Sequence, residues 1–218
     1  MAAAVLLDVD GTLVDTNYHH ALAWYRAFRE EGIMLPVWRI HRHVGMGGDQ
    51  LVPALVPGID RELHEAIETA REKRYAELLD EVAPFDEAHE LIVDLKRSGV
   101  TVVLASSSPQ DELDHYLELL DAQDVADSWT TKDDVDATKP EPDLVVAALE
   151  KAGAADAVLV GDTAWDVEAA RKAGLHTTIC VMTGGWAKQE LLDAGAAVVY
   201  ESLAELRQNL ERPPLSLS

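Results

Sequence analysis

Apolar positions along the chain fall into short unbroken runs, separated by longer stretches in which apolar residues recur every three or four positions. The unbroken runs cover residues 2–7, 100–105, 157–160, 177–182 and 196–200. A strand with one face in water alternates apolar and polar residues, whereas a continuous run of Val, Leu and Ala is typical of a strand covered on both faces. We therefore expect these runs to form a parallel sheet with helices on both sides.

The stretches between the runs have helical periodicity. They cover residues 86–98, 109–120, 142–152 and 165–173. Three of them are followed directly by a glycine, the residue that most commonly ends a helix. Strands that alternate with helices in this way are typical of βαβ units. The predicted fold class is therefore α/β, with a doubly wound parallel sheet.

One long segment departs from this alternation. It contains helical patterns at residues 17–31 and 61–82, a stretch rich in glycine and proline between them, and no convincing strand. We predict a small all-helical insertion after the first strand. The predicted organisation is an α/β core of residues 1–15 and 84–212, a helical insertion of residues 16–83, and a frayed tail of residues 213–218.

The chain has a strong excess of acidic residues. It has 218 residues, with 40 Asp and Glu against 18 Lys and Arg, which gives a formal net charge of −22. Such a chain lacks the basic surface that neutralises nucleic-acid phosphates, and anionic membrane surfaces repel it. Because 48% of the residues are hydrophobic, the acidity does not indicate a disordered chain. We expect neither nucleic acid nor membrane as a partner.

The sequence predicts no targeting signal and no disulfide. The first apolar run lacks a basic segment before it and stops at Asp8, and no window approaches the apolar length of a membrane span. Cys180 is the single cysteine, so no disulfide forms within the chain. These features favour a cytoplasmic location.

Polar residues gather directly after the predicted strands. In chain order they are Asp8 and Asp10, Ser106 and Ser107, and Asp162 and Asp166, with Lys139 in a loop before a predicted helix. In open α/β sheets, ligands bind beyond the carboxyl ends of the strands. We therefore expect these side chains to converge on one site.

This set of side chains suits phosphate chemistry at a metal ion. Clustered carboxylates repel one another unless a cation lies among them, and oxygen ligands without Cys or His favour Mg²⁺. Lys139 would add a fixed positive charge, while the serine hydroxyls and the amides of Gly11 and Thr12 would donate hydrogen bonds to an oxyanion. An anion held there indicates nucleophilic attack by the Asp8 carboxylate on phosphorus. Asp10 would protonate the leaving oxygen and later activate water.

The same segments resemble the four motifs of the haloacid dehalogenase (HAD) superfamily, in its aspartate-nucleophile phosphatase branch, which includes phosphoglycolate phosphatases and β-phosphoglucomutases. The motifs are DVDGTLVDT at residues 8–16, LASSS at residues 104–108, KPEPD at residues 139–143, and VGDTAWDVEAARKAG at residues 160–174. Their order and spacing fit the superfamily. The helical insertion lies where the superfamily places a type-1 cap, so the resemblance implies a Rossmann-like core with a small all-α cap.

The resemblance also implies a role for each motif residue. Asp8 would be the nucleophile and Asp10 the general acid and base. Lys139 would hold phosphate and nucleophile, and Ser106 would bind the phosphoryl group. The Mg²⁺ ligands would be Asp8, Asp10 through its backbone carbonyl, and Asp162, with Asp166 supporting the metal or Lys139 from behind.

Residues of the insertion add further candidates. His20 lies near the junction with the core, where contact with substrate is one hypothesis and ordinary packing the other. Arg42 would meet a distal anionic group, and the glycine cluster at residues 45–48 is either a specificity loop or a plain turn. The predicted residues that bind substrate or phosphate are Gly11, Thr12, Ser106, Ser107, His20 and Arg42.

The leading hypothesis is a Mg²⁺-dependent phosphatase that hydrolyses a small phosphomonoester, phosphoglycolate-like or a sugar phosphate, through an aspartyl-phosphate intermediate. The alternative is a sugar-phosphate mutase of the β-phosphoglucomutase kind, which would use the same core. A haloacid dehalogenase is disfavoured because Asp10 stands where those enzymes typically carry an aromatic residue, and the intact acidic motifs disfavour an inactive binding protein. The predicted partner is a small phosphorylated metabolite, and the sequence leaves the oligomeric state open.

Overall fold

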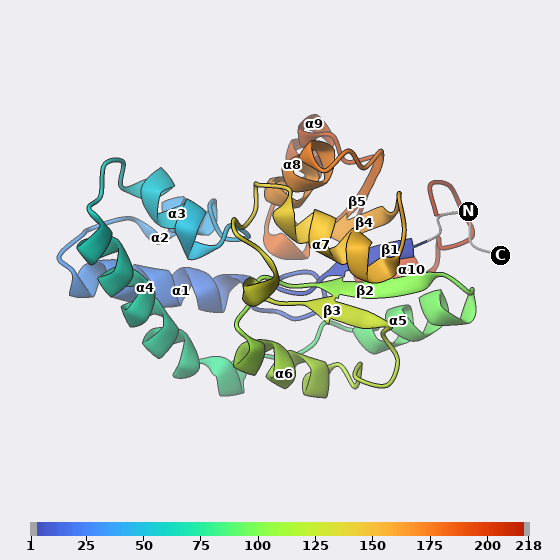
Figure 1. Ribbon diagram of the computed structural model, residues 1–218, viewed down its shortest axis with the longest axis horizontal. Helices are drawn as coiled ribbons and strands as arrows, with labels where there is room; N and C mark the ends of the chain where they lie inside the picture. The colour runs from blue at the N-terminus through green and yellow to red at the C-terminus, as the bar shows by residue number, and fades with distance from the viewer. Residues whose placement is uncertain (1–3, 216–218) are drawn as a thin grey trace.

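The computed structural model describes residues 4–215. Its centre is a six-stranded sheet in which neighbouring strands are parallel (Figure 1). The strands are β1 (Ala4–Asp8), β2 (Thr101–Ala105), β3 (Ser128–Thr130), β4 (Val158–Gly161), β5 (Thr177–Val181) and β6 (Val198–Tyr200). Their spatial order is β3-β2-β1-β4-β5-β6, so the chain extends the sheet to one side of β1 and then to the other. The predicted doubly wound parallel sheet is confirmed.

Helices cover both faces of the sheet. One face carries α5 (Ala88–Arg97), α6 (Gln110–Leu119) and α10 (Leu203–Arg207), and the other carries α7 (Asp143–Ala152) and α8 (Ala164–Lys172), with α9 (Lys188–Ala194) beside α8. In β1, Val5 and Leu7 pack into the first of these layers, whereas Leu6 packs into the second. Both faces of β1 are therefore buried, which explains why its sequence is continuously apolar.

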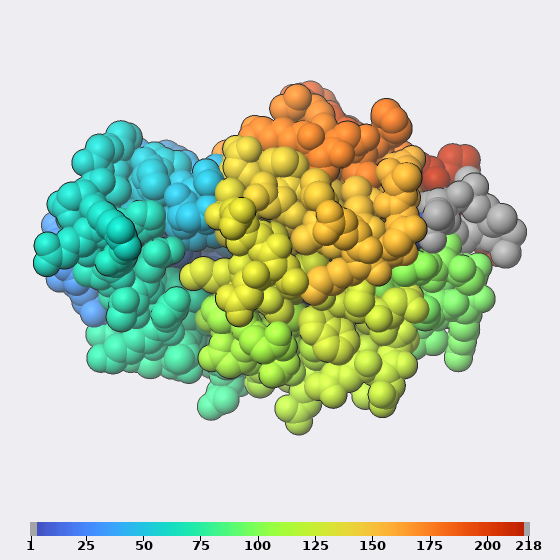
Figure 2. Space-filling view, in the orientation of Figure 1, coloured from blue at the N-terminus to red at the C-terminus, as the bar shows by residue number. Residues whose placement is uncertain are grey.

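The helices between β1 and β2 form a lobe of their own. The cap lobe consists of α1 (Asn17–Glu30), α2 (Val37–His41), α3 (Gly48–Leu55) and α4 (Arg61–Ala76). Its separate hydrophobic cluster includes Trp24, Phe28, Ile40, Leu51 and Ile67. Figures 1 and 2 show the cap lobe, coloured from blue to teal, at one end of the molecule beside the core. The all-α cap expected from the resemblance is present.

The chain leaves the core and returns to it at one place. Val14 pairs with Pro84, and the amide of Asp15 donates to the carbonyl of Ala83 over 2.9 Å. The two crossings into the cap lobe therefore lie side by side, an arrangement suited to a hinge. The boundaries after residues 15 and 83 stay a prediction.

Several elements differ from the sequence prediction. β3 has no counterpart among the predicted runs, because its residues SWT include one large apolar side chain and it lies at the sheet edge. The helix predicted at residues 61–82 ends at Ala76, and a short 3₁₀ turn, Leu79–Glu81, follows it. The tail predicted to fray begins at residue 213, yet Leu215 is buried in the main hydrophobic cluster. Residues 216–218 of that tail lie outside the described residues.

Candidate active site

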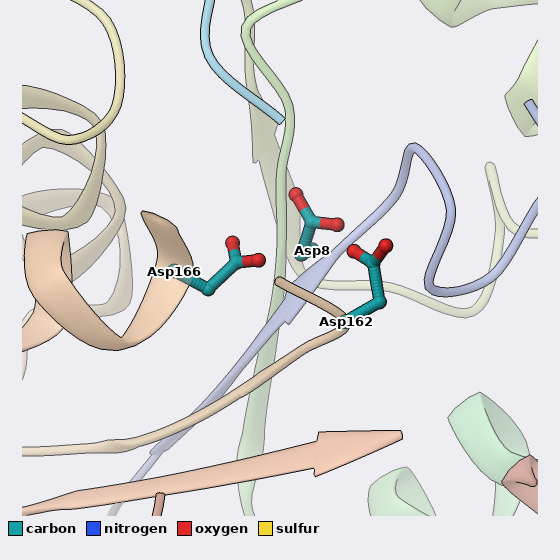
Figure 3. A group of neighbouring side chains, drawn as sticks. All are labelled: Asp8, Asp162 and Asp166. Carbon is teal, nitrogen blue, oxygen red and sulfur yellow. The ribbon is translucent and has the colours of Figure 1, made fainter. Parts of the chain in front are cut away.

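The predicted carboxylates converge where the winding of the sheet reverses. β1 lies between β2 and β4, and Asp8 ends β1 while Asp162 directly follows β4. Asp166 comes from the first turn of α8. Figure 3 shows the three carboxylates turned toward one another, and one oxygen atom of each lies within 4.8 Å of the others. The cluster thus forms beyond the carboxyl ends of two adjacent strands, the usual location of a ligand site in this kind of sheet.

Lys139 supplies positive charge to this cluster. Its ammonium group contacts the carboxylate of Asp8 and lies 2.6 Å from Oδ1 of Asp166, and the residue is 4% exposed. Burial opposes protonation, but the two carboxylates outweigh burial and raise the pKa of Lys139 above its usual value. Lys139 is therefore charged and held beside Asp8.

Asp166 is fixed by the start of α8. Its Oδ2 accepts hydrogen bonds from the amide of Thr163 over 3.0 Å and from the Thr163 hydroxyl over 2.6 Å. This capping box leaves the other carboxylate oxygen to Lys139. Asp166 thus lies behind Lys139 and does not line the cavity described below.

The acidic cluster carries more negative charge than one lysine balances. Burial, opposed by Lys139 and reinforced by Asp166, raises the pKa of Asp8 to about 7. Burial also raises the pKa of Asp162, and repulsion from Asp166 and Asp8 adds to the shift. A hard divalent cation with oxygen ligands relieves such repulsion, so the donor set of Asp8 and Asp162 fits Mg²⁺.

Mg²⁺ is expected to raise the melting temperature of this protein more at about pH 8 than at about pH 5. The folded-state pKa of Asp8 is raised from 3.8 to about 7, so the free energy of unfolding of the metal-free protein falls as the pH rises between those values. Mg²⁺ binds the deprotonated carboxylates and removes that penalty. Thermal unfolding in EDTA and in Mg²⁺ at both pH values measures the difference, and an equal Mg²⁺ effect at both would contradict it.

Asp10 has different partners from Asp8. Its Oδ1 accepts a hydrogen bond from Nε2 of His20 over 2.9 Å, and its Oδ2 accepts from the hydroxyls of Ser108 over 2.9 Å and Ser106 over 3.4 Å. Burial alone would raise the pKa of Asp10, but hydrogen bonds from His20 and Ser108 and the charge of His20 lower it to about 2. The environment thus shifts the pKa values of Asp8 and Asp10 in opposite directions.

His20 reaches the site from α1 of the cap lobe. Its ring stacks on Tyr75 of α4, with the ring centroids 4.0 Å apart, and this packing fixes the direction of Nε2 toward Asp10. His20 also lines the cavity. Its contact in this structure is therefore with Asp10, and contact with substrate stays a prediction.

Gly11 and Thr12 form the turn after β1, and their amides are not free to bind an anion. Both amides donate to backbone carbonyls of the same turn, over 2.8 and 3.3 Å. The hydroxyl of Thr12 lies 2.7 Å from Asp8 Oδ2 and 3.0 Å from Asp162 Oδ1, so it tethers two carboxylates. Phosphate binding by Gly11 and Thr12 stays a prediction. Among the described residues, the amide of Asp10 has no acceptor, and it is the free donor of this turn.

Of the serines after β2, Ser106 and Ser108 are buried, and only Ser106 does not line the cavity. Ser106 is 1% exposed, and its hydroxyl accepts a hydrogen bond from the amide of Ser108 over 3.0 Å. Ser107 and Ser108 line the cavity. Phosphate binding by Ser106 and Ser107 stays a prediction.

A cavity of about 400 Å³ separates the acidic cluster from the cap lobe. Its core side includes Asp8, Asp10 and Lys139, and its cap side includes the glycine cluster at residues 45–48. The amide of Gly47 donates to the hydroxyl of Thr138 over 2.9 Å, and a Cβ at Gly47 would lie 2.4 Å from that oxygen. Glycine at this position therefore lets the cap lobe approach the loop that carries Lys139.

Arg42 does not line this cavity, and its contact with substrate stays a prediction. Its guanidinium forms two hydrogen bonds with Glu190, over 2.8 and 3.2 Å, and lies 3.5 Å from the ring centroid of Trp186. The indole of Trp165 donates to the Arg42 carbonyl over 3.3 Å. Arg42 thus docks the cap lobe onto residues of the core through an ion pair and a cation–π contact.

Sequence reasoning misses several residues of this site. They are Asn17, Asp49, Arg71, Ser108 and Thr138, all of which line the cavity. Asp49 accepts a hydrogen bond from the amide of Thr138 over 3.0 Å, and Arg71 pairs with Glu112 over 2.9 Å, so both join cap and core. Asn17 carries the one usable signal, because it begins the first helix directly after the motif at residues 8–16.

Comparison with known proteins assigns the family. The sequence pattern of the haloacid dehalogenase-like hydrolases matches residues 2–174. The chain belongs to this family. The matched region includes Asp8, Lys139 and Asp162, so the family predicted from the motifs is confirmed.

Relatives and solved structures agree with this assignment. The hydrolase is 29% identical to pyrophosphatase PpaX of Bacillus velezensis over 80% of this chain and 81% of that protein. It is 28% identical to phosphoglycolate phosphatase of Rhodospirillum rubrum over 94% of this chain and 90% of that protein. The crystal structure of a hydrolase from Pseudomonas syringae superposes with a TM-score of 0.91 at 32% identity, covering 97% of this chain and 99% of the other. The predicted enzyme class, a HAD-type phosphoric monoester hydrolase, is confirmed.

Proposed function

We propose that this hydrolase is a Mg²⁺-dependent phosphatase that acts on a small phosphomonoester through an aspartyl-phosphate intermediate. The observation that carries the proposal is the environment of Asp8, which lines the cavity and contacts Lys139. Two residues later lies Asp10, whose pKa is lowered whereas that of Asp8 is raised. When bound by Asp8, Asp162 and the backbone carbonyl of Asp10, Mg²⁺ would offset charge on the phosphoryl oxygens. Lys139 opposes the effect of burial on the pKa of Asp8 and so favours the ionised form of the nucleophile.

The reaction proceeds in two transfers. In the first, an oxygen of Asp8 attacks phosphorus, the ester P–O bond breaks, and a proton from Asp10 passes to the leaving alcohol. In the second, water attacks the phosphorus of the aspartyl-phosphate, Asp10 takes the proton of that water, and the P–O bond to Asp8 breaks. Phosphate then leaves, and the Asp8 carboxylate is restored.

His20 makes the double role of Asp10 possible. The pKa of Asp10 is lowered to about 2, so Asp10 is an ionised base in the arrangement described and must receive a proton before it acts as an acid. Nε2 of His20 donates a hydrogen bond to Asp10 over 2.9 Å and is positioned to supply that proton. The Ser108 hydroxyl holds the other oxygen of the carboxylate.

The charges of the cavity favour a phosphatase over a sugar-phosphate mutase. Transfer of the phosphoryl group to a second sugar oxygen passes through a bisphosphate, which needs cationic groups at the far side of the cavity. The cap side instead carries Glu68 and Glu72, and Arg71 there is paired with Glu112. This balance also favours a sugar phosphate over a substrate with a second acidic group, such as phosphoglycolate.

One observation supports the alternative hypothesis of a sugar-phosphate mutase. A candidate β-phosphoglucomutase from Bacteroides vulgatus superposes with a TM-score of 0.85 at 26% identity, covering 96% of this chain and 88% of the other. The two activities differ in product. With glucose 1-phosphate, a phosphatase releases inorganic phosphate, whereas a mutase forms the 6-phosphate without stoichiometric release.

Chelation tests the proposal. Phosphate release from p-nitrophenyl phosphate is expected to fall by more than about 10²-fold in EDTA and to recover with Mg²⁺, because a metal ion contributes several kcal/mol to such a transition state. A panel of glucose 1-phosphate, glucose 6-phosphate, phosphoglycolate and pyrophosphate then defines the substrate class. Full activity in EDTA, or conversion of glucose 1-phosphate without phosphate release, would overturn the proposal.

The remaining predictions concern partners and location. A small phosphorylated metabolite is the partner that the cavity would hold. Within residues 4–215, no helix combines the length and apolar composition required to cross a bilayer. The cytoplasmic location stays a prediction from the sequence.

A further inference from the structure

Asn17 lies at the junction of the cap lobe and the acidic cluster. It is the first residue of α1, it is 1% exposed, and it lines the cavity together with Asp8. Its Nδ2 donates a hydrogen bond to Oδ2 of Asp162 over 2.7 Å. Because a carboxylate accepts and never donates when ionised, the amide nitrogen is the group that must face Asp162. A residue of the cap lobe therefore contacts a residue of the metal site directly.

The turn after β1 is shaped to admit this side chain. Gly11 has φ of +83°, and a Cβ at that position would lie 2.0 Å from Nδ2 of Asn17 and 2.6 Å from Oδ2 of Asp162. Any residue with a Cβ would displace the amide from Asp162. The hydroxyl of Thr12 lies 3.0 Å from the other oxygen of Asp162. Asn17 donates to one oxygen of that carboxylate, and the Thr12 hydroxyl, whose single proton is shared with Asp8, lies within hydrogen-bonding distance of the other.

The second polar atom of Asn17 has no partner. Among the described residues, nothing donates a hydrogen bond to Oδ1, although this oxygen is buried. A buried acceptor without a donor costs about 1–3 kcal/mol, so a bound molecule that supplies the donor is favoured there. Asn17 lines the cavity, so a molecule bound there is one source of such a donor.

We propose that Asn17 is a positioning residue of the Mg²⁺ site. Its Nδ2 fixes the direction of the Asp162 carboxylate, and its Oδ1 accepts a hydrogen bond from the hydration shell of the bound ion. Mg²⁺ in proteins keeps several waters, and each of those waters needs acceptors for its hydrogens. Groups that orient metal ligands typically contribute a factor of about 10–100 to metal affinity. This inference rests on the proposed Mg²⁺ dependence of the enzyme.

Calorimetric titration of the EDTA-stripped full chain with MgCl₂ tests the role. Asn17→Ala is expected to weaken Mg²⁺ binding by about 10–100-fold relative to the wild type. Asn209→Ala is the matched control, because the Asn209 side chain lies in the carboxyl-terminal region and donates to the Glu205 carbonyl over 2.7 Å. The affinity of this variant for Mg²⁺ is expected to equal that of the wild type. Asn17→Ser, which keeps a short donor and acceptor, is expected to fall between wild type and Asn17→Ala.

Two further measurements separate this role from a structural one. The melting temperature in EDTA shows whether each variant folds. The second measurement is the Mg²⁺ concentration that gives half-maximal hydrolysis of p-nitrophenyl phosphate. In Asn17→Ala this concentration is expected to rise by a larger factor than the factor by which kcat falls at saturating Mg²⁺. A lower melting temperature with unchanged Mg²⁺ affinity would overturn the inference and leave the proposed function intact. A wild type that binds no Mg²⁺ would overturn both.

Discussion

Asp8→Asn is expected to abolish hydrolysis of p-nitrophenyl phosphate, with a loss of at least about 10⁴-fold, as found when a catalytic nucleophile is removed. The amide of asparagine is a poor nucleophile, and it no longer forms the ion pair that Lys139 makes with Asp8. Acid quenching of wild type during turnover should reveal protein that has gained one phosphoryl group, and Asp8→Asn should gain none. Initial rates and intact-protein mass spectrometry measure both results.

Asp10→Asn is expected to lower the rate of p-nitrophenyl phosphate hydrolysis by about 10²–10⁴-fold, the usual contribution of a general acid and base. p-Nitrophenolate leaves without a proton, so the first transfer of this substrate is less affected than the attack of water. The phosphorylated protein should therefore accumulate in Asp10→Asn. With an alkyl phosphate the first transfer also needs the proton, and the loss should be larger.

Asp15→Asn is the matched control for both variants. Asp15 belongs to the same motif, and its side chain is exposed. Its activity should equal that of wild type. Substantial turnover by Asp8→Asn, with a melting temperature like that of wild type, would exclude Asp8 as the nucleophile.

The core of this site could be predicted from the sequence because topology determines it. A run such as AVLLD in β1 is apolar throughout only when both faces are covered, and this identifies a parallel sheet. Parallel strands present their carboxyl ends at one edge, so Asp8 and Asp162 meet although they lie far apart in the sequence. Lys139 lies in a loop and not at a strand end, so its contact with Asp8 is implied by the resemblance to the family motifs and not by topology.

The cap side could not be predicted, because no comparable rule fixes the direction of its side chains. α2 has five residues, and nothing in its sequence indicates whether Arg42, at its end, faces the cavity or the core. The structure places it against Glu190, which lies 148 positions further along the chain. The contact between Asp10 and His20 could not be predicted either, although the two residues are only ten positions apart. The His20 ring is directed toward Asp10 because it stacks on Tyr75.

Lys139→Ala is expected to cause the largest loss of stability in the metal-free protein. The lysine is 4% exposed and contacts Asp8 and Asp166, which are themselves 3% and 1% exposed. Removal of one partner of a buried ion pair leaves uncompensated charge and typically costs about 3–5 kcal/mol. Urea unfolding in EDTA at about pH 8 measures the free energy of unfolding. Lys188→Ala, an exposed lysine of α9, is the control and should change it by less than about 0.5 kcal/mol.

The loss should depend on pH in a definite direction. Burial already raises the pKa of Asp8 above its unfolded value, and removal of the lysine raises it further. Protonation of Asp8 below about pH 5 removes its charge, so the difference between Lys139→Ala and wild type should shrink at low pH and grow toward pH 8. Mg²⁺ supplies positive charge to the same carboxylates and should restore part of the lost stability. A difference that stays constant across this range would mean that Lys139 does not influence the ionisation of Asp8 in the metal-free enzyme.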